Sequence, residues 1–340
     1  MKKIHIALSI FCLAILGIAI HFYQIIYSTQ IGNSTSFYIK STDSIAQVLS
    51  NLDAICKDIN NVKTVASLKK YNTPKPGRYV LAKGMNANQI INILRSGKQT
   101  PIKVTFNNQN YIEDLAGRLA MQIEADSVAI LRSLTNPDFL DKHNFNYKTA
   151  LNYCMPYTYN CYWNISPDQL RNKLYQAYLR YWNKERQQKA QQLNLTQNEV
   201  IALASIVHKE TQYKPERKRV AGVYLNRIRK GIPLQADPTI IYALKEKQGK
   251  KVIIKRVLTK DLEIDSPYNT YKKRGIPPSA IAMPDIDAID AVLNPERHHY
   301  YYFCASADHL GTHKFAQTLR QHNRNAYEYH RWLQKQRIHR

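Results

Sequence analysis

Residues 203–239 read LASIVHKETQYKPERKRVAGVYLNRIRKGIPLQADPT, and this stretch decides the fold around one acidic side chain, Glu210. The helix that contains it is predicted to begin at Thr196, because Thr196-Gln197-Asn198-Glu199 has the capping-box spacing. Counting three and seven residues back from Glu210 gives Val207 and Leu203, so the carboxylate extends an apolar helical stripe. The sequence therefore predicts a partly buried carboxyl group at the end of a helix.

A carboxyl group in that position suits acid catalysis. Burial raises the pKa of a carboxyl group, and the negative end of a helix dipole acts in the same direction. A glutamate that is protonated near neutral pH can donate a proton to a glycosidic oxygen. The alternative is a solvated glutamate, or one that pairs with the arginines that follow, since a single motif is only a hypothesis.

Six short motifs stand in order around Glu210, from residue 204 to residue 281. They are Ala204-Ser205-Ile206-Val207, Lys209-Glu210-Thr211, Val223-Tyr224-Leu225-Asn226-Arg227, Pro233-Leu234-Gln235-Ala236-Asp237-Pro238-Thr239, Pro267-Tyr268-Asn269-Thr270-Tyr271 and Gly275-Ile276-Pro277-Pro278-Ser279-Ala280-Ile281. With these motifs the stretches 204–244 and 266–315 resemble the endolytic murein transglycosylase family, the YceG-like or MltG group. Several ordered motifs with compatible gaps are more specific than any one of them.

The resemblance implies that Glu210 is the catalytic residue. The family usually reads Glu-Lys-Glu-Thr where this chain has His208-Lys209-Glu210-Thr211, and its catalytic glutamate is the second of the two. His208 therefore replaces a non-catalytic glutamate, and we expect activity to survive. If the reaction required the family's first glutamate, its replacement by His208 would contradict the interpretation of this chain as an enzyme.

The number of carboxylates bears on the reaction class. Glycoside hydrolases generally use two, an acid plus a base or nucleophile. A lytic transglycosylase needs one. Glu210 would protonate the oxygen between MurNAc and GlcNAc and then take the proton from the C6 hydroxyl of the same MurNAc, which closes a 1,6-anhydro ring. This chemistry requires no cofactor. We also predict no metal, because His298, His299, His309 and His313 lack a ligand spacing.

We expect the substrate cleft to include six further residues: Asn226, Gln235, Asp237, Tyr268, Asn269 and Thr270. Asn226 could bond an N-acetyl group or the catalytic carboxyl, or it could be a structural brace. Asp237, followed by Pro238, has the pattern of a helix cap, which we favour over a second carboxylate near Glu210. The Tyr268–Thr270 stretch is expected to form the opposite wall of the cleft.

The N-terminus predicts a single-pass membrane anchor. Residues 1–3 carry two lysines, and residues 4–27 are mostly apolar, which exceeds the ~20 residues needed to cross a bilayer. A cleaved signal peptide would have a shorter apolar core and a small-x-small cleavage site, and neither is clear here. The positive-inside rule leaves residues 1–3 as a cytoplasmic tail, so the body is expected in the periplasm of a bacterium, attached to its inner membrane.

Two folded parts are expected after the anchor, with an overall α+β class. Residues 34–100 contain alternating short strands and helices, and the resemblance implies a LysM-like module associated with glycan binding. The alternative is a unit that only spaces or braces the catalytic domain. Residues 101–340 are expected to form the catalytic transglycosylase domain, mostly helical with some strands.

Composition limits the partners. The chain has 44% hydrophobic and 22% charged residues, which is a globular composition, and its net charge is +24. No nucleic-acid motif accompanies this charge, so we expect acidic partners such as anionic lipid headgroups or the free carboxylates of cell-wall peptides. The expected substrate is the glycan strand of peptidoglycan, and the resemblance implies proximity to cell-wall synthases. Cys154 and Cys161 are a candidate disulfide pair.

Two other functions stay open. A muramidase would hydrolyse the same bond with Asp237 or another acid as its second carboxylate. A non-catalytic, membrane-tethered glycan-binding or assembly protein would be unaffected by Glu210→Gln. The chemistry of the product end and the effect of that substitution distinguish the three.

Overall fold

Two compact units make up the part of the chain that the computed structural model describes, residues 2–336. The N-terminal unit extends to Val104 and also includes Leu119–Asp126 and Thr158–Ser166. The C-terminal unit consists of Thr105–Arg118, Ser127–Tyr157 and the described residues from Pro167 onward. Both units combine helices with short strands, so the mixed helix-and-strand class is confirmed.

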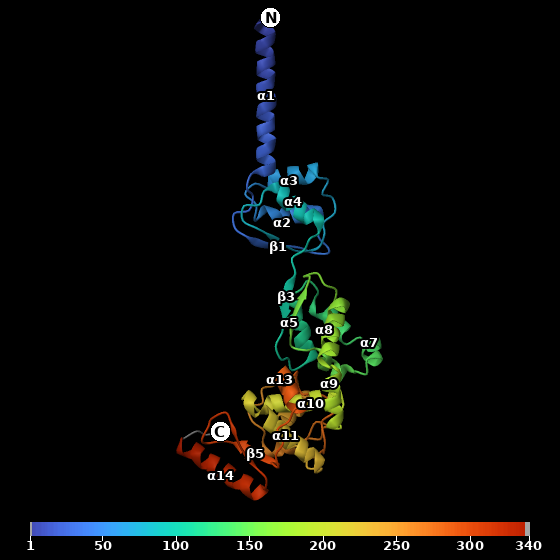
Figure 1. Ribbon diagram of the computed structural model, residues 1–340, viewed down its shortest axis with the longest axis vertical. Coiled ribbons are helices and arrows are strands. Elements are labelled where there is room, and N and C mark those ends of the chain that lie inside the picture. The colour runs from blue at the N-terminus through green and yellow to red at the C-terminus, as the bar shows by residue number, and fades with distance from the viewer. Residues whose placement is uncertain (1, 337–340) are drawn as a thin grey trace. The chain divides into compact units, whose positions relative to one another are not determined.

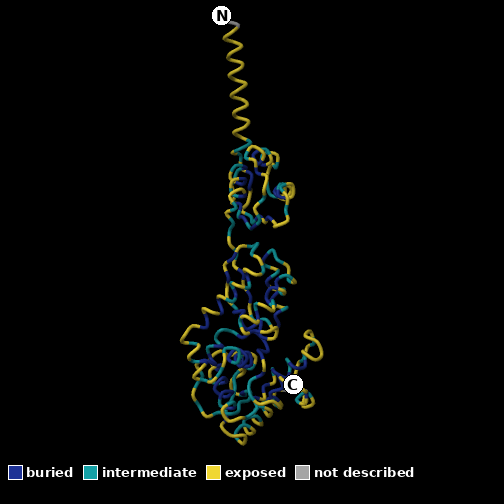
Figure 2. The backbone as a smooth tube through the Cα atoms, turned by 90° about the vertical axis from the view of Figure 1, so that its right-hand side faces the viewer, coloured by how far each residue is buried: buried dark blue, intermediate teal, exposed yellow. Residues whose placement is uncertain are grey.

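The first helix is long and apolar. α1 (Lys2–Tyr27) is the one helix within residues 2–336 whose length and composition would allow it to cross a membrane. Figure 2 shows it exposed along almost its whole length. Only its last turn is partly buried, where Ile25 and Ile26 pack against the core of the N-terminal unit. An exposed apolar surface of this extent marks a candidate interaction surface.

The N-terminal unit is built on one antiparallel strand pair. β1 (Thr35–Ile39) pairs with β2 (Gly77–Leu81), and α2 (Ile45–Asp53) and α3 (Ile59–Leu68) connect them. The helices gather on one side of the strands, together with α4 (Ala87–Ser96) (Figure 1). The short strands and helices expected over residues 34–100 are present. In α3 half of the residues are apolar, and Val62, Val65 and Ala66 are its buried positions.

The rest of the chain is mainly helical. β3 (Ile102–Thr105) and β4 (Thr158–Cys161) form a second strand pair, and β5 (Tyr302–Ala305) and β6 (His313–Ala316) form an antiparallel third. The helices before residue 200 are α5 (Ile112–Ala120), α6 (Ser127–Leu134), α7 (Pro137–Lys142), the 3-10 helix Tyr147–Tyr153, α8 (Pro167–Tyr181) and α9 (Lys184–Gln192). After these come α10 (Gln197–Glu210), α11 (Arg217–Arg229), α12 (Asp237–Gln248), α13 (Ile286–Leu293) and α14 (Leu319–Lys335), with short 3-10 helices at Lys214–Glu216 and Thr259–Glu263.

α10 is the central helix of the C-terminal unit. The predicted capping box is confirmed. The Glu199 N–H donates to the Thr196 hydroxyl oxygen, and the Thr196 N–H donates to the Glu199 carboxylate. Every residue from Val200 to Val207 is buried, and α9, α11, α12 and α13 all pack against this helix. A helix that is buried all round is held rigidly by packing. Its C-terminal residue, Glu210, is therefore fixed in position.

A buried arginine holds the helices that follow α10. Arg217, the first residue of α11, is almost fully buried and forms ion pairs with Asp285 and Asp287 at the start of α13. Its Nε also donates to the carbonyl of Thr211, 3.4 Å away, directly after Glu210. Removing one partner of a buried ion pair typically costs several kcal/mol, because the other charge is left unpaired. Arg217 thus connects α10, α11 and α13.

The candidate disulfide is not present. Cys154 and Cys161 are both buried free thiols. Their closeness in sequence suggested a pair, but Cys154 belongs to the C-terminal unit and Cys161 to the N-terminal unit. Sequence separation alone does not set the geometry that a disulfide requires.

Two matched isoleucines test the role of the α10 core. Ile206 is 0% exposed in α10, whereas Ile253 is 84% exposed. Ile206→Ala should lower the free energy of unfolding by about 2–5 kcal/mol, because it leaves a cavity in a close-packed core. Ile253→Ala should change it by less than about 0.5 kcal/mol. Denaturant unfolding of the full chain in detergent measures both, and equal effects would contradict the central position of α10.

Candidate active site

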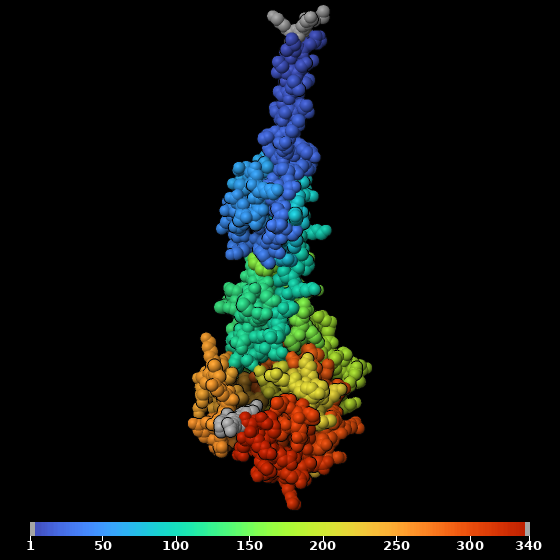
Figure 3. All heavy atoms as spheres, turned by 90° about the vertical axis from the view of Figure 1, so that its left-hand side faces the viewer, coloured from blue at the N-terminus to red at the C-terminus, as the bar shows by residue number. Residues whose placement is uncertain are grey.

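Glu210 lies in a cavity of about 450 Å³ in the C-terminal unit. The side chains around it come from α10, α11, the start of α12, the β5–β6 pair and α14. They are Glu210, Tyr224, Arg227, Leu234, Gln235, Asp237, Tyr271, Tyr302, Phe303, Cys304, Ala305, His313, Leu319 and His322. Figure 3 shows a recess in this unit between the orange segment that follows α12 and the red C-terminal segment. The volume is in the range of about 300–1,000 Å³ that is typical of small-ligand sites.

Glu210 combines burial with one specific hydrogen bond. The hydroxyl of Tyr224, on α11, donates to Glu210 Oε1 at 2.9 Å. Burial is the largest influence on Glu210 and raises its pKa from 4.5 to about 7, and the negative charge of Asp237 acts in the same direction. The Tyr224 hydrogen bond and the positive charge of Arg227 partly oppose this shift. A carboxyl group with this pKa can give and take a proton near neutral pH.

Asp237 brings a second carboxylate to the same cavity. The hydroxyl of Tyr271 donates to Asp237 Oδ1 at 2.5 Å, and burial followed by this bond raises the Tyr271 pKa. The expected capping role is corrected by the structure: the cap of α12 is Ala236, which provides no side-chain bond, and Asp237 is the first helical residue. The carboxylate faces Tyr271 and the cavity instead.

Gln235 is held by Arg227 and by its own backbone. Arg227 Nη1 donates to Gln235 Oε1 at 3.2 Å and to the carbonyls of Pro233 and Leu234 at 3.1 and 2.8 Å. Gln235 has a φ of +52°, a left-handed conformation that costs free energy in a residue other than glycine. Its N–H donates to the carbonyl of Thr270 at 3.0 Å. These bonds hold Gln235 in its strained conformation, and its side chain lines the cavity, as expected.

The structure does not bring Tyr268, Asn269 and Thr270 into the cavity. All three are buried, and their polar atoms bond inside the protein. The Tyr268 hydroxyl lies 2.6 Å from Ser279 Oγ, and Thr270 Oγ1 lies 2.8 Å from Thr239 Oγ1. Asn269 Nδ2 donates to two backbone carbonyls at 2.7 and 2.8 Å. These residues support the wall of the cavity, and the next residue, Tyr271, is the one that faces it.

Asn226 also lies away from Glu210. Its Nδ2 donates to the carbonyls of His298 and Tyr300 at 2.9 and 3.1 Å, and it lines a different cavity. Of the three roles considered for Asn226, the geometry matches the structural brace. The expected residues that the structure gathers with Glu210 are therefore Gln235 and Asp237.

Several residues of the cavity were missed by the sequence analysis. Tyr224 and Arg227 belong to a quoted motif, and their spacing of three residues on one helix was the available signal. His313 and His322 gave no signal, because their place depends on the packing of β6 and α14. His313 Nδ1 lies 2.9 Å from the buried Glu216 carboxylate, so that histidine is already bonded within the protein.

His208 points into a separate polar cluster. Its Nδ1 lies 3.2 Å from Asp285 and 3.3 Å from Arg217 Nη2, and it does not line the Glu210 cavity. Burial is the largest influence on His208 and lowers its pKa. His208, the position that departs from the family pattern, therefore contacts the ion pair between Arg217 of α11 and Asp285 before α13. It does not line the Glu210 cavity.

Comparison with known proteins gives consistent matches. A family model described as the YceG-like family matches residues 37–328. The endolytic murein transglycosylase of Bacillus subtilis (strain 168) is 29% identical over 307 residues, which cover 85% of this chain and 82% of that protein. A protein of the same name from Streptococcus pneumoniae serotype 2 (strain D39) is 28% identical over 294 residues, covering 78% of this chain and 52% of that protein.

A solved structure is also similar. The crystal structure of a YceG-like protein from Listeria monocytogenes aligns with a TM-score of 0.57 at 26% identity. The alignment covers 86% of this chain and 98% of that chain. The similarity in fold thus extends over most of both chains.

The raised pKa of Glu210 predicts a pH-dependent effect of Glu210→Gln on stability. Between pH 4.5 and about 7 the folded state binds more protons than the unfolded state, so wild-type stability falls as pH rises. Glutamine has no such dependence. The variant should therefore gain stability relative to wild type between pH 4.5 and 8, by up to about 3 kcal/mol.

Denaturant unfolding at several pH values measures this difference. Glu263→Gln, which removes an exposed carboxylate, is the matched control. If the two variants followed the same pH dependence, the buried state of Glu210 would be contradicted.

Proposed function

The chain belongs to the YceG-like family, and on that premise we propose that it is a lytic transglycosylase that cleaves peptidoglycan glycan strands internally. The observation that carries this proposal is the carboxyl group of Glu210. It lies in a cavity of ligand size and has a pKa near 7. The relatives from Bacillus subtilis and Streptococcus pneumoniae are both named endolytic murein transglycosylase, which supports the same reaction.

In the proposed mechanism Glu210 acts first as an acid. Its proton passes to the oxygen that links MurNAc to GlcNAc, and the bond from C1 of MurNAc to that oxygen breaks. The Glu210 carboxylate then takes the proton of the C6 hydroxyl, whose oxygen forms the new bond to C1. The pKa of about 7 suits both steps, because neither protonation state is strongly disfavoured.

Neighbouring side chains support these steps. The Tyr224 hydroxyl, 2.9 Å from Glu210 Oε1, stabilises the carboxylate formed after the first proton transfer. Asp237 lies in the same cavity, where its negative charge would favour the positive charge that develops at C1. Gln235, held by Arg227, offers a polar group to the sugar.

Asp237 also keeps the muramidase alternative open. A hydrolase of the same bond needs a second carboxylate to activate water or to act as nucleophile. Asp237 is the carboxylate that could do so, since it shares the cavity with Glu210. The two reactions differ in their products: a transglycosylase leaves 1,6-anhydroMurNAc ends, and a muramidase leaves reducing ends.

We further propose a location at the bacterial inner membrane. α1 has the length and composition of a membrane span, and the body that follows it would lie in the periplasm. The N-terminal unit, with its β1–α2–α3–β2 order, would be the LysM-like module and would bind glycan. Cell-wall synthases would be partners, because the substrate is a newly made strand.

Analysis of the product ends tests the reaction. The full chain in detergent is incubated with purified peptidoglycan, beside the Glu210→Gln variant, and the products are examined by mass spectrometry. We expect new 1,6-anhydroMurNAc ends, one water lighter than hydrolytic ends, and a loss of at least about 100-fold in the variant. Reducing ends would establish the muramidase, and products unaffected by the substitution would exclude Glu210 as the acid.

The Tyr224 hydroxyl predicts a shift in the pH profile. Tyr224→Phe removes a hydrogen bond that lowers the Glu210 pKa, so that pKa should rise further. The alkaline limb of kcat/KM should then move to higher pH by up to about one unit, since such a bond contributes about 0.5–1.5 kcal/mol. A limb that moved to lower pH would contradict the proposed role of Tyr224.

A further inference from the structure

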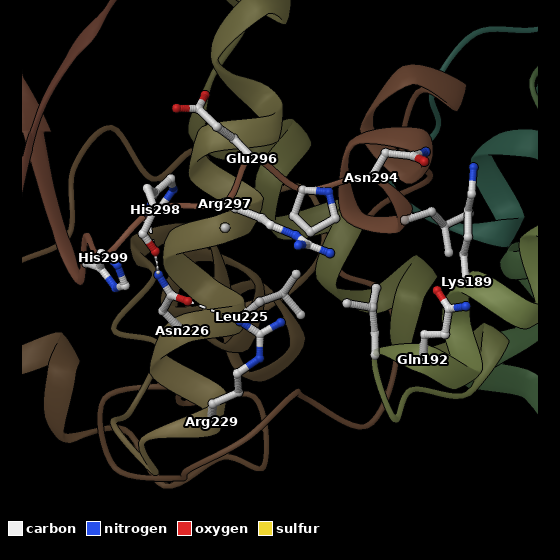
Figure 4. A pocket seen from close by; sticks show the side chains of 14 residues that line it. Lys189, Gln192, Leu225, Asn226, Arg229, Asn294, Glu296, Arg297, His298 and His299 are labelled. Atoms are coloured by element: carbon white, nitrogen blue, oxygen red, sulfur yellow. Dashed lines mark hydrogen bonds between the residues drawn. The ribbon is translucent and has the colours of Figure 1, made fainter.

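A second and larger cavity lies on the other side of α11. Its volume is about 880 Å³, and it is bounded by α9, α11, the end of α13 and the segment 294–299 (Figure 4). From α11 it is lined by Gly222, Leu225, Asn226 and Arg229, whereas Tyr224 and Arg227 line the Glu210 cavity. Successive helical residues are rotated by about 100°, so these two sets occupy opposite faces of one helix. The proposed mechanism does not use this second cavity.

The walls of the second cavity are close and well supported. Gly222 allows the segment 296–298 to lie directly against α11, because a Cβ there would come within 2.6 Å of the Glu296 carbonyl and of His298 Nε2. Asn226 fixes the continuation of this segment through the carbonyls of His298 and Tyr300. The segment continues into β5, which lines the Glu210 cavity. α11 is therefore a wall of both cavities, and the segment connects the second cavity to a strand of the first.

The charge of the second cavity is positive. Lys189, Arg229 and Arg297 line it, and the carboxylate present is Glu296. Glu296 accepts from Arg219 Nε at 2.9 and 3.1 Å, and Figure 4 shows it pointing away from Arg297. Lys189 lies 2.7 Å from Glu185, which neutralises much of its charge.

Two arginines remain for a ligand. Arg229 donates to the neutral Asn226 Oδ1 at 3.2 Å, and Arg297 extends into the middle of the cavity (Figure 4). Neither arginine forms an ion pair with a carboxylate among residues 2–336. A guanidinium group binds a carboxylate through two parallel hydrogen bonds.

The remaining lining favours a peptide over a small inorganic anion. Gln192 and Asn294 also line the cavity (Figure 4), where the Gln192 amide can bond peptide groups, whereas Asn294 Nδ2 donates to the Asp290 carbonyl at 2.9 Å and leaves its Oδ1 to accept a bond. Leu193, Leu225 and Leu293 provide apolar contacts for small side chains. The volume also exceeds what a lone phosphate would occupy, and it lies within the range of about 300–1,000 Å³ typical of small-ligand sites.

We propose that this cavity binds the carboxylate-bearing peptide stem of the glycan strand, with Arg229 and Arg297 as the groups that hold the carboxylate. The inference rests on the proposed function, because it assigns the stem to the substrate cleaved at Glu210. An α-helix with its side chains is about 10–12 Å wide. The path around one side of such a helix is half its circumference, about 16–19 Å, which takes an extended peptide of about five residues, so a stem of that length can reach around α11 from a sugar in the Glu210 cavity.

Binding to strands with and without stems tests the proposal. The full chain in detergent carries Glu210→Gln, so that binding is measured without cleavage. The probes are fluorescent glycan strands that bear peptide stems and the same strands stripped of peptide by an amidase. We expect stripped strands to bind at least about tenfold more weakly than strands with stems. In the double variant Arg229→Gln with Arg297→Gln, the ratio of the two affinities should fall to about one.

A matched control separates the cavity from general electrostatics. Arg132→Gln with Arg180→Gln removes the same charge from exposed helical positions outside both cavities, and it should keep the preference. Inorganic phosphate at the concentration of the strand should not compete. Equal binding of the two strands, an equal loss in the control, or efficient competition by phosphate would overturn the proposal. Product analysis on the active protein decides the proposed function separately.

Discussion

The partial burial of the Glu210 carboxyl group is the constraint on which the site depends. Such burial costs free energy in the charged form, so it persists only where packing fixes the group. α10 supplies that packing, since its residues from Val200 to Val207 are buried on all sides. One hydroxyl, that of Tyr224, moderates the cost by bonding the carboxylate. Stability is thus reduced at neutral pH in order to keep a proton available, which is typical of functional carboxyl groups.

The same helix that carries Tyr224 organises the surroundings. α11 places Tyr224 and Arg227 towards Glu210, while its opposite face, with Asn226 and Arg229, lines the larger cationic cavity. Arg217 at its start is bonded to Asp285 and Asp287, so α11 cannot move independently of α13. In the proposed function, a glycan chain and its peptide substituents would therefore meet two chemically different faces of one helix: a proton donor on one side and guanidinium groups without a carboxylate partner on the other.

Local patterns predicted the helix and its acid, but not the walls of the site. The capping box at Thr196 and the stripe that ends at Glu210 depend on residues three or four apart, and both were found from the sequence. Asn269 and Thr270 looked like binding residues because polar groups in a loop often face solvent, yet here they satisfy buried backbone and side-chain groups. The contributions of Tyr271, His313 and His322 depend on segments that are 60 to more than 100 residues from Glu210. No local pattern encodes that packing.

Direct titration of the Glu210 carboxyl group tests the account most closely. Infrared difference spectra between wild type and Glu210→Gln, recorded from pH 4 to 9, isolate the protonated and ionised bands of this one residue. A midpoint near pH 7 is expected, because burial raises the pKa of this carboxyl group. A midpoint near 4.5, the ordinary value for glutamate, would show a solvated carboxylate and would contradict its role as the proton donor.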